Sequence, residues 1–436
     1  MRNKTAIIYV NDKAIEFSDL MVGGLTLIER HVLALYYHGI REILITAPKS
    51  EWSKFQIRRS FEDLNLIYTE KPESFSDSYF IRGDTVFHKG FIADLDAFLD
   101  GTEYTDAVMT GKALNGSTWF SHSDGFSLDG FLNLYIGISW FSAESLEKIF
   151  NSHDEERDPD IGFLEDNFSN PLLGTAIGKE LFFRKIDSVT DAKTAETLLF
   201  HSLRKPQDGI ISRLFNRTLS LPVSRILVKT SLTPNQLSVI NAGFAIISGF
   251  MLFFGNNLLG LSFYISGFLG GLFMQMCSIY DGCDGEVARV KFQYTHTGDW
   301  LDTIIDDITN SIFFAGVAAW SWFSTGQERF IYMGVAAFVG QWIANYSMYY
   351  YLIKIAGTGN NQDYKVTTGK SKLFDMFLNN IKYLTKRDFH LFAFFVMGIA
   401  GRLDIGAYII CAFAVGAGLI LGIQHIILLI TGVKKA

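Results

Sequence analysis

The amino-acid sequence predicts two unlike parts, an α/β soluble domain at residues 1–203 and an all-α polytopic membrane domain at residues 234–436. In the first part, short apolar runs alternate with amphipathic stretches, as in α/β folds with a largely parallel sheet. In the second part, the apolar runs lengthen to the roughly 20 residues that a helix needs to cross a bilayer. Residues 204–233 connect the two parts.

The strands of the first part are predicted from short runs rich in β-branched and aromatic residues. These runs are TAIIYV (5–10), EILIT (42–46), LNLIYT (64–69), DAVMT (106–110), LYIGISWF (134–141) and LFFRKID (181–187). Amphipathic periodicity predicts helices at 26–38 and 143–151, which would pack on the sheet.

The connecting segment is predicted to contain a helix that lies in the membrane interface. Its apolar residues fall on one helical face, which suits such a location. These residues are Ile210, Ile211, Leu214 and Phe215. An ordinary amphipathic linker helix is the alternative. Pro222 is expected to break the helix in two, because proline removes a backbone donor. Thr233 and Pro234 then have the pattern of a helix cap and a first helical residue.

The membrane domain is predicted to contain six spanning helices, of which the fifth is short. They lie near 235–254, 258–281, 298–323, 330–354, 388–402 and 405–431. Each of the others is long enough for a hydrocarbon core of about 30 Å.

Basic residues are distributed unequally between the loops of this domain. Lys and Arg gather in 289–297, 355–387 and 434–436, on the side of the N-terminal domain, whereas the opposite side has Arg329 and Arg402. The positive-inside rule therefore predicts a multi-pass cell-membrane protein whose N-terminal domain, loop 289–297 and C-terminus are cytoplasmic. The formal net charge of −7 argues against nucleic acid as a partner and leaves the lipid bilayer as the expected one.

Acidic residues gather between two long apolar runs, in the segment 281–306, which reads DGCDGEVARVKFQYTHTGDWLDTIID. Asp281 and Asp284 are three residues apart and Asp302 and Asp306 four apart, so each pair lies on one helical face. Two such helices side by side bring four carboxylates together, and these stay ionised only if cations neutralise them. Oxygen ligands favour hard ions, so the segment predicts a site for Mg²⁺ or Mn²⁺ that suits two ions. A proton or cation relay in a transporter is the alternative.

Small residues beside the acids point to a large ligand. Gly285, Ala288 and Gly298 remove side-chain bulk, which lets a ligand approach the backbone closely. Arg289 is placed to donate to phosphate oxygens. Asp299 and Asp307 fall outside the pattern and are interpreted as helix-end or loop charges.

These residues form the pattern D-x-x-D-G-x-x-A-R-x8-G-x3-D-x3-D, which resembles the signature of the CDP-alcohol phosphotransferases. The resemblance implies an enzyme that transfers the phosphoalcohol moiety of a CDP-alcohol to an acceptor hydroxyl and releases CMP, as in phospholipid biosynthesis. It also implies that Asp281, Asp284 and Asp302 bind the metals and that Asp306, also near a metal, is the general base. The active site then lies near the cytoplasmic face.

The same resemblance extends to two further features. It places Asn235 near the nucleotide, alongside the small residues and Arg289 of the motif. It also implies a homodimer, for which the sequence offers small residues that allow close helix packing. These are Gly267, Gly270, Gly271 and Gly416.

The loop 355–387 is expected to face an anionic acceptor. Arg387, at the membrane edge beside Asp388, is the single candidate for a phosphate contact. Positive-inside topology alone explains the other basic residues of this loop. They include Lys365, Lys370, Lys372 and Lys386.

The N-terminal domain resembles sugar-nucleotide-type nucleotidyltransferases at 22–45, 82–87 and 185–199. Asp84 and Asp187 match positions that would hold a metal. After the first strand, however, the chain reads NDKAIEF, without the glycines and basic residues that bind a triphosphate. We therefore expect a degenerate domain with a structural or regulatory role.

Two donors remain open within the resemblance. A CDP-diacylglycerol donor would give a phospholipid, and a soluble CDP-polyol such as CDP-inositol would give an inositol-type phosphodiester. A cation-coupled transporter regulated by its cytoplasmic domain is an alternative of another class, and it predicts flux without CMP release.

Overall fold

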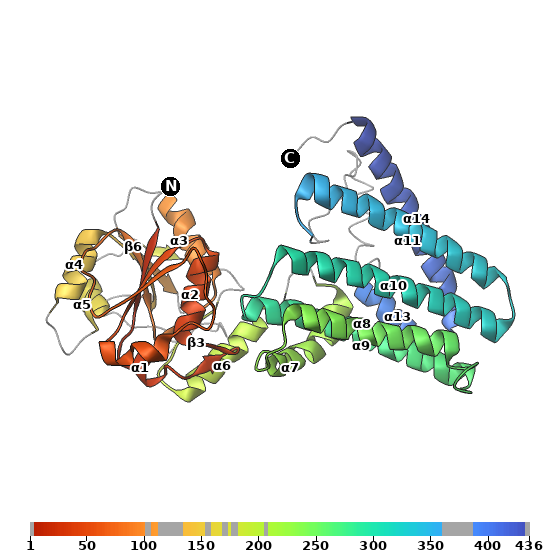
Figure 1. Cartoon of the computed structure of the whole chain (residues 1–436), viewed down its shortest axis with the longest axis horizontal. Coiled ribbons are helices and arrows are strands. Elements are labelled where there is room, and N and C mark those ends of the chain that lie inside the picture. Colours follow the sequence, from red (N-terminus) through yellow and green to blue (C-terminus); the bar gives the residue numbers. More distant parts are fainter. Residues whose placement is uncertain are drawn as a thin grey trace. The chain divides into compact units, whose positions relative to one another are not determined.

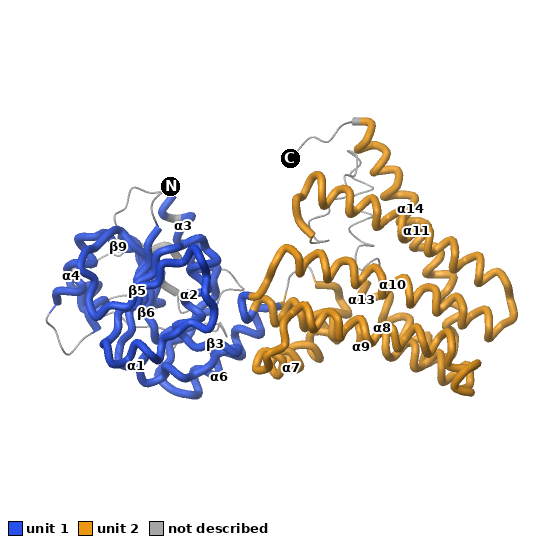
Figure 2. The backbone as a smooth tube through the Cα atoms, viewed as in Figure 1, with its two compact units in different colours: residues 1–203, 290–292 blue, residues 204–289, 293–436 orange. Residues whose placement is uncertain are grey.

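The computed structural model describes residues 4–100, 106–111, 134–152, 158–167, 173–175, 182–204, 208–359 and 387–431. The chain divides into two compact units, coloured separately in Figure 2. Unit 1 comprises Met1–Leu203 and Val290–Phe292, and unit 2 comprises Arg204–Arg289 and Gln293–Ala436. The lysines of the loop 355–387 and the basic C-terminus 434–436 lie outside the described residues.

Unit 1 is an α/β domain built on a seven-stranded sheet (Figure 1), which confirms the predicted fold class. The sheet order is β10-β8-β9-β6-β1-β4-β5. The strands are β1 (Thr5–Tyr9), β4 (Glu42–Thr46), β5 (Asn65–Thr69), β6 (Ser78–Arg82), β8 (Ala107–Gly111), β9 (Leu134–Phe141) and β10 (Leu173–Thr175). β1, β4, β5 and β6 are mutually parallel, whereas β9 runs antiparallel to β6 and β8.

The helices of unit 1 follow the strands in the expected alternation. They are α1 (Asp12–Glu16), α2 (Leu27–Tyr37), α3 (Gly90–Asp100), α4 (Ala143–Asn151), α5 (Pro159–Asn167) and α6 (Val189–His201), with a 3-10 helix at Lys49–Phe55. Two small antiparallel sheets join β2 (Met21–Val22) to β3 (Leu25–Thr26) and β7 (Thr85–Phe87) to β11 (Phe183–Lys185). The run 181–187 therefore contributes β11 outside the main sheet.

The strand order changes direction at β1. From β1 the chain adds β4 and then β5 on one side, and it returns to place β6 on the other side. In open α/β sheets, ligands bind at the carboxyl ends of the strands beside such a point. The residues there, between the ends of β1 and β6, are therefore the natural place to look for a site in unit 1.

Unit 2 is helical, and each of the six predicted apolar segments contains a helix (Figure 1). The helices are α8 (Pro234–Phe254), α9 (Phe263–Val290), α10 (His296–Thr325), α11 (Arg329–Tyr351), α13 (Arg387–Ile399) and α14 (Leu403–Thr431). α7 (Arg217–Leu227) precedes them, and π-helical turns occur at Ser212–Asn216 and Leu352–Ala356.

Three helices of the described chain are long and apolar enough to cross a membrane, namely Pro234–Phe254, Phe263–Val290 and Leu403–Ile430. The predicted count of six spans is therefore not confirmed. α13 has 13 residues, which is short for a span. α10 carries four aspartates, and α11 carries Gln341 and Asn345 among its apolar residues.

The connecting segment departs from the prediction at one residue. Pro222 lies inside α7 and does not break it. Ser220 and Ser224, on either side of it, are hydrogen-bonded to α9, so tertiary contacts hold the helix where a backbone donor is missing. Thr233 and Gln236 form a capping box at the start of α8, with Pro234 as its first residue, as predicted.

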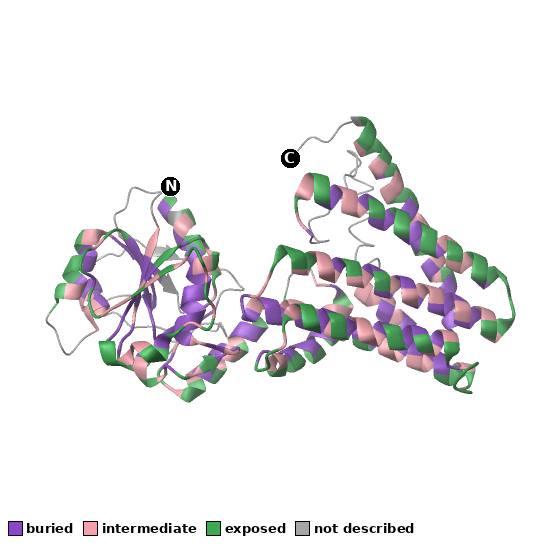
Figure 3. Cartoon of the chain, in the orientation of Figure 1, coloured by how far each residue is buried: buried purple, intermediate pink, exposed green. Residues whose placement is uncertain are grey.

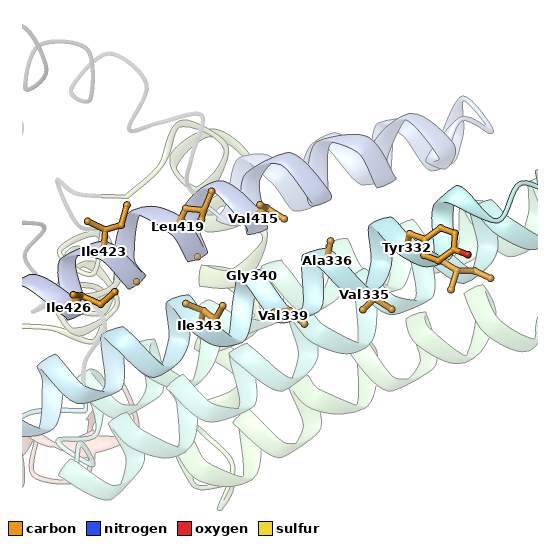
Figure 4. A pocket seen from close by; sticks show the side chains of 13 residues that line it. Tyr332, Val335, Ala336, Val339, Gly340, Ile343, Val415, Leu419, Ile423 and Ile426 are labelled. Carbon is orange, nitrogen blue, oxygen red and sulfur yellow. The ribbon is translucent and has the colours of Figure 1, made fainter.

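The bundle interior is packed with large apolar side chains, including Met274, Phe313, Trp320 and Phe394. Many apolar residues on its outer faces are exposed, most of all on α14 (Figure 3). α11 and α14 frame an apolar groove of about 840 Å³, lined by residues such as Val339, Ile343, Leu419 and Ile423 (Figure 4). Surfaces of this kind suit contact with lipid chains rather than water.

Candidate active site

α9 and α10 bring acidic side chains together. Asp281 of α9 and Asp302 and Asp306 of α10 each present a carboxylate oxygen, and these oxygens all lie within 4.8 Å of one another. On α10 the two acids are one turn apart and so share a face. Helical spacing within each helix and the pairing of the two helices therefore produce the cluster.

Asp284, the fourth predicted acid, is buried one turn beyond Asp281 and is not among those three. Its Oδ2 accepts a hydrogen bond of 2.5 Å from Ser238 Oγ of α8, and its Oδ1 accepts one from the Gly285 amide. Ser238 therefore fixes the orientation of this carboxylate.

Arg387, the first residue of α13, lies against the cluster. Its Nη1 is 2.5 Å from Asp306 Oδ2 and 3.2 Å from Asp281 Oδ1, and its Nε donates to Asn310 Oδ1 at 3.1 Å. Its Nη2 is buried and has no hydrogen-bond partner. The guanidinium thus neutralises part of the acidic charge and retains a donor for an anion.

The donor set fits a hard divalent cation. All three clustered side chains offer carboxylate oxygens, which Mg²⁺ and Mn²⁺ prefer over softer ligands. Asp306 Oδ1 is buried and receives no hydrogen bond. A buried carboxylate oxygen without a donor is costly unless a cation satisfies it, so this atom is the strongest single indication of a metal ligand.

The small residues of the motif lie where a larger side chain would crowd a neighbour. A Cβ at Gly285 would be 3.2 Å from Arg289 Nη1, and a Cβ at Gly298 would be 3.2 Å from Asn235 Oδ1. The structure therefore brings Asn235 beside Gly298, as a shared nucleotide site would require. Ala288 is buried on α9, and Arg289 Nε is buried without a partner.

Three residues near the cluster escaped the sequence analysis. Ser238 contacts Asp284, Asn241 Nδ2 lies 3.4 Å from Asp281 Oδ1, and Asn310 binds Arg387. A signal for them was present. Asn235, Ser238 and Asn241 recur every three residues along an apolar helix, and Asn310 continues the four-residue spacing of Asp302 and Asp306.

Asp307 corrects one interpretation. It was expected at a helix end or in a loop, but it is buried within α10 and accepts a hydrogen bond from the Tyr349 hydroxyl of α11. The Tyr349 ring in turn packs edge-on against Trp300, with 5.8 Å between the ring centroids. Asp307 therefore ties α10 to α11 just beyond the cluster.

Unit 1 holds a second acidic cluster, beside the ends of β1 and β6. Asp84 accepts two hydrogen bonds from Arg82, at 3.1 and 2.9 Å, and one of 2.8 Å from Asn11. Arg82 also donates to Asp158 at 2.6 Å and to Asp160 at 2.7 Å. The side chains of Arg82, Asp84 and Asp160 are almost wholly buried, so a guanidinium fills this position.

Asp187, the other candidate metal ligand of unit 1, is engaged elsewhere. Its carboxylate pairs with Lys185 at 2.9 Å and is 45% exposed. The described residues contain one group of three or more potential metal ligands, the cluster in unit 2. Burial raises the pKa of Asp160 to about 6, while the other acids of its cluster raise the pKa further and Arg82 opposes the shift.

The geometry of unit 2 defines a carboxylate centre on two neighbouring helices of a membrane-type bundle. Residues 231–400 match the family model described as CDP-alcohol phosphatidyltransferase.

The chain is similar to several curated proteins. It is 34% identical over 138 residues to the bifunctional IPC transferase and DIPP synthase of Aquifex aeolicus. This match covers 31% of this chain and 29% of that protein. It is 30% identical over 163 residues to the protein of the same name from Thermococcus kodakarensis, covering 37% and 34%. The chain thus spans about a third of the length of these relatives.

Among solved structures, the chain is similar to an inositol-1-phosphate CTP transferase from T. maritima. The match has 11% sequence identity and a TM-score of 0.31, and it covers 44% of this chain and 94% of that one. A TM-score of 0.31 at 11% identity establishes neither a shared fold nor a shared function.

Proposed function

We propose that the protein is a CDP-alcohol phosphotransferase, which transfers the phosphoalcohol moiety of a CDP-alcohol to an acceptor hydroxyl and releases CMP. The observation that supports this most directly is the meeting of Asp281, Asp302 and Asp306 within 4.8 Å, inside the region that matches the family. The product is a phosphodiester, such as a phospholipid.

The proposed cofactor is Mg²⁺ or Mn²⁺, as two ions held by Asp281, Asp284, Asp302 and Asp306. Such ions, when bound, stabilise charge on the attacking and leaving oxygens of a phosphoryl transfer. Ser238 and Asn241 orient Asp284 and Asp281 for this purpose through their hydrogen bonds.

Asp306 is proposed as the general base. It takes the proton of the acceptor hydroxyl, whose oxygen then bonds to the phosphorus that carries the alcohol. The bond between this phosphorus and the oxygen that stays on CMP breaks, so CMP leaves with that oxygen. Arg387 contacts Oδ2 of Asp306, while Oδ1 receives no hydrogen bond, so this carboxylate is open to the acceptor hydroxyl as well as to a metal ion.

The nucleotide site is proposed to consist of Asn235, Gly285, Ala288, Arg289 and Gly298. The steric room at the two glycines and the unpartnered Nε of Arg289 support this assignment. Arg289 would bind phosphate oxygens of the donor, since a guanidinium matches their charge and geometry.

Arg387 is proposed to bind a phosphate of the acceptor. Its position at the cluster and its free Nη2 support this role. A residue that neutralises the acids and also binds the acceptor would place the hydroxyl close to Asp306.

The names of the relatives bear on the donor. Several are called bifunctional IPC transferase and DIPP synthase, and others are called phosphatidylinositol phosphate synthase. The latter name favours an inositol-containing substrate. CDP-diacylglycerol and CDP-inositol are therefore the two donors to be compared.

The expected arrangement has six membrane spans, with the N-terminal domain, active site and C-terminus in the cytoplasm, and a homodimer. Gly267, Gly270 and Gly271 do not support the dimer, because a Cβ at each would meet Trp320, Leu252 or the Phe394 carbonyl of the same chain. The dimer would have to use other surfaces.

The N-terminal domain is proposed to be a degenerate nucleotidyltransferase-like domain with a structural or regulatory role. The burial of Asp84 against Arg82 supports this proposal, because a metal ion would have to displace the guanidinium. Asp187 pairs with Lys185 and therefore does not join Asp84 as a second metal ligand in this arrangement.

The test is CMP release by the purified protein with Mg²⁺, with CDP-diacylglycerol and CDP-inositol as separate donors and pooled polyol and lipid acceptors. Asp306→Asn removes the base, and Asp404→Asn is a matched control in an acid that pairs with Arg402 at 3.0 Å, away from the cluster. Release with one donor, lost in Asp306→Asn and kept in Asp404→Asn, would support the proposal and identify the donor. Cation flux without CMP release would favour a transporter instead.

A further inference from the structure

Glu286 lies inside the motif but has no place in the proposed chemistry. It is fully buried on α9, between Asp284 and Arg289. Its Oε1 accepts hydrogen bonds from Arg217 Nη1 and from Ser220 Oγ, the latter at 2.8 Å, and its Oε2 accepts one of 2.6 Å from Ser224 Oγ. All three donors belong to α7, so one carboxylate binds two helices together.

Arg217 has a second acidic partner at the start of the same segment. Asp208 accepts hydrogen bonds from Arg217 Nε at 3.0 Å and from Arg217 Nη2 at 3.2 Å. Arg217 therefore lies between two carboxylates, and its planar guanidinium holds each in a fixed direction. The residues are buried, which protects these interactions from screening by water and salt.

The contact between α7 and α9 continues for several turns. Asn216 Nδ2 donates to Ser278 Oγ at 3.1 Å, and Gln275 Nε2 donates to Asn216 Oδ1 at 3.0 Å. Gly282 gives the network room, because a Cβ there would lie 2.9 Å from Arg217 Nη1. Gln275, Ser278, Gly282 and Glu286 recur every three or four residues, so they form one face of α9.

That face is opposite the acids of the candidate active site. At about 100° per residue, Glu286 points about 140° away from Asp281 and about 160° away from Asp284 around the helix axis. The hydrogen bonds between Glu286 and α7 therefore fix the rotation of α9 about its own axis. This rotation sets the direction of the Asp281 and Asp284 side chains.

The same segment also contacts α13. The Ser212 amide, in the π-helical turn before α7, donates to Asp388 Oδ2 at 2.7 Å. Asp388 follows Arg387, the residue that contacts Asp281 and Asp306. Residues 208–224 thus touch two helices, each beside a group of the site.

Stability alone is a poor explanation for this arrangement. Replacing a buried ion pair by apolar residues of similar volume is often neutral or stabilising. α7 has apolar residues available, but it exposes several of them, with Ile226 69% and Leu219 43% exposed, and it turns its polar residues inward. A helix with apolar residues outside and polar residues inside suits the membrane interface, where lipid covers its outer face. Its inner polar residues are then available to orient α9.

We propose that Glu286 is a positioning residue, which uses Arg217, Ser220 and Ser224 to set the rotation of α9 and so the placement of the Asp281 and Asp284 carboxylates. This inference rests on the proposed function, since it assigns Glu286 to the same metal-dependent site.

The test uses the full-length protein in lipid nanodiscs and two variants. Glu286→Gln keeps the size and the hydrogen bonds with the serines and removes the charge. The double variant Ser224→Ala/Glu286→Leu replaces the carboxylate and one of its serine partners with apolar side chains, and it leaves Arg217 paired with Asp208. Asp404→Asn serves as the control, because it removes an acid that pairs with an exposed arginine, Arg402. The readouts are Mn²⁺ affinity by electron paramagnetic resonance, the melting temperature, and kcat and KM for CMP release.

We expect both Glu286 variants to bind Mn²⁺ about 10-fold or more weakly and to lose a similar factor in kcat, as after loss of groups that orient metal ligands. The donor KM should change much less than kcat. The double variant should keep the melting temperature of the wild type. Wild-type Mn²⁺ affinity and kcat in the double variant would overturn the inference and reduce the network to a packing role.

The two proposals fail in different ways. Weakened Mn²⁺ binding in Glu286→Gln, in a wild type that releases no CMP from any donor, would reject the proposed reaction and retain the positioning role. CMP release that depends on Asp306 but is unaffected at Glu286 would retain the reaction and reject the positioning role.

Discussion

The two units each gather three carboxylates around an arginine, and the two clusters differ in what they leave unsatisfied. In unit 1, Arg82 contacts Asp84, Asp158 and Asp160 through all its nitrogens, and Asn11 adds a further donor to Asp84. In unit 2, Arg387 contacts Asp281 and Asp306, while its Nη2 has no partner and Asp306 Oδ1 receives no hydrogen bond. Asp160 Oδ2 in unit 1 also lacks a hydrogen-bond partner, so the clusters differ in their arginines. Arg82 uses every guanidinium nitrogen within its cluster, whereas Arg387 keeps a donor for a ligand.

The difference has a physical origin in how each charge is neutralised. Several buried carboxylates repel one another and stay ionised only beside a cation. A guanidinium that is part of the chain supplies this cation permanently, at the place where an α/β sheet would bind its ligand. In unit 2 one arginine again faces three acids, but its contacts go to Asp281 and Asp306 and leave Asp306 Oδ1 without a donor, which gives a reason to bind Mg²⁺ or Mn²⁺.

The largest effect is expected from Asp306→Asn, which removes one carboxylate from the acidic cluster of unit 2. Loss of a general base typically costs 10²- to 10⁴-fold, so kcat for CMP release should fall by about that factor. The measurement is steady-state CMP release with the better donor. A kcat within about threefold of wild type would assign the base elsewhere.

The next largest effect is expected in the acidic cluster around Arg82 in unit 1. Arg82→Met leaves Asp84 and Asp160 buried without their counter-ion, and breaking such a pair typically costs about 3–5 kcal/mol. We expect a lower melting temperature for unit 1, partly restored by Mn²⁺, and about one more Mn²⁺ bound per chain than in wild type. The measurements are calorimetry and metal titration.

The control for this variant is Arg41→Met, which removes an exposed arginine that pairs with Asp63 in the same unit. Exposed pairs contribute about 0–1 kcal/mol, so little change is expected there. An Arg82→Met protein as stable as wild type and without additional Mn²⁺ would show that Arg82 does not substitute for a metal.

A smaller effect is expected from Arg387→Met. Loss of a charge-assisted hydrogen bond to a phosphate is worth about 1.5–3 kcal/mol, so the KM for a phosphorylated acceptor should rise about 10- to 100-fold. Mn²⁺ affinity should increase, because a competing cation has been removed from Asp281 and Asp306. Unchanged acceptor KM with unchanged Mn²⁺ affinity would contradict both roles.

The smallest effect concerns pH. Burial raises the pKa of Asp160 to about 6, above its ordinary value of 3.8, so the folded state binds this proton more tightly than the unfolded state. Stability from this group is therefore present below pH 4 and is lost as pH rises through about 6. Relative to Asp160→Asn, the wild type should lose about 2 kcal/mol of unfolding free energy between pH 4.5 and pH 7.

The comparison with Asp160→Asn is necessary because other buried groups titrate in the same range. Burial lowers the pKa of both His31 and His88 to about 4, and these shifts stabilise the folded protein as pH rises. A difference between the two proteins that does not depend on pH would show that Asp160 does not titrate in this window. The measurement is urea unfolding at several pH values.

Helical periodicity made much of the unit 2 site predictable. Asp302 and Asp306 share a face because they are four residues apart, and six predicted apolar segments contain helices. Local rules were less successful where tertiary contacts compete. Pro222 lies within α7 because Ser220 and Ser224 are bonded to α9, and Asp307 is buried because Tyr349 supplies a donor.

The sequence by itself determined the two-part architecture, the match of residues 231–400 to a family model and the spacing that lets Asp281, Asp302 and Asp306 converge. These features depend on periods of a few residues, which one sequence displays. Only the tertiary structure decided that Arg82 reaches Asp160, 78 residues away, that Arg387 reaches Asp281, 106 residues away, and that Arg217 reaches Glu286, 69 residues away. Such pairings depend on how whole elements pack, since any basic residue can neutralise any acid and only the fold selects which of them meet.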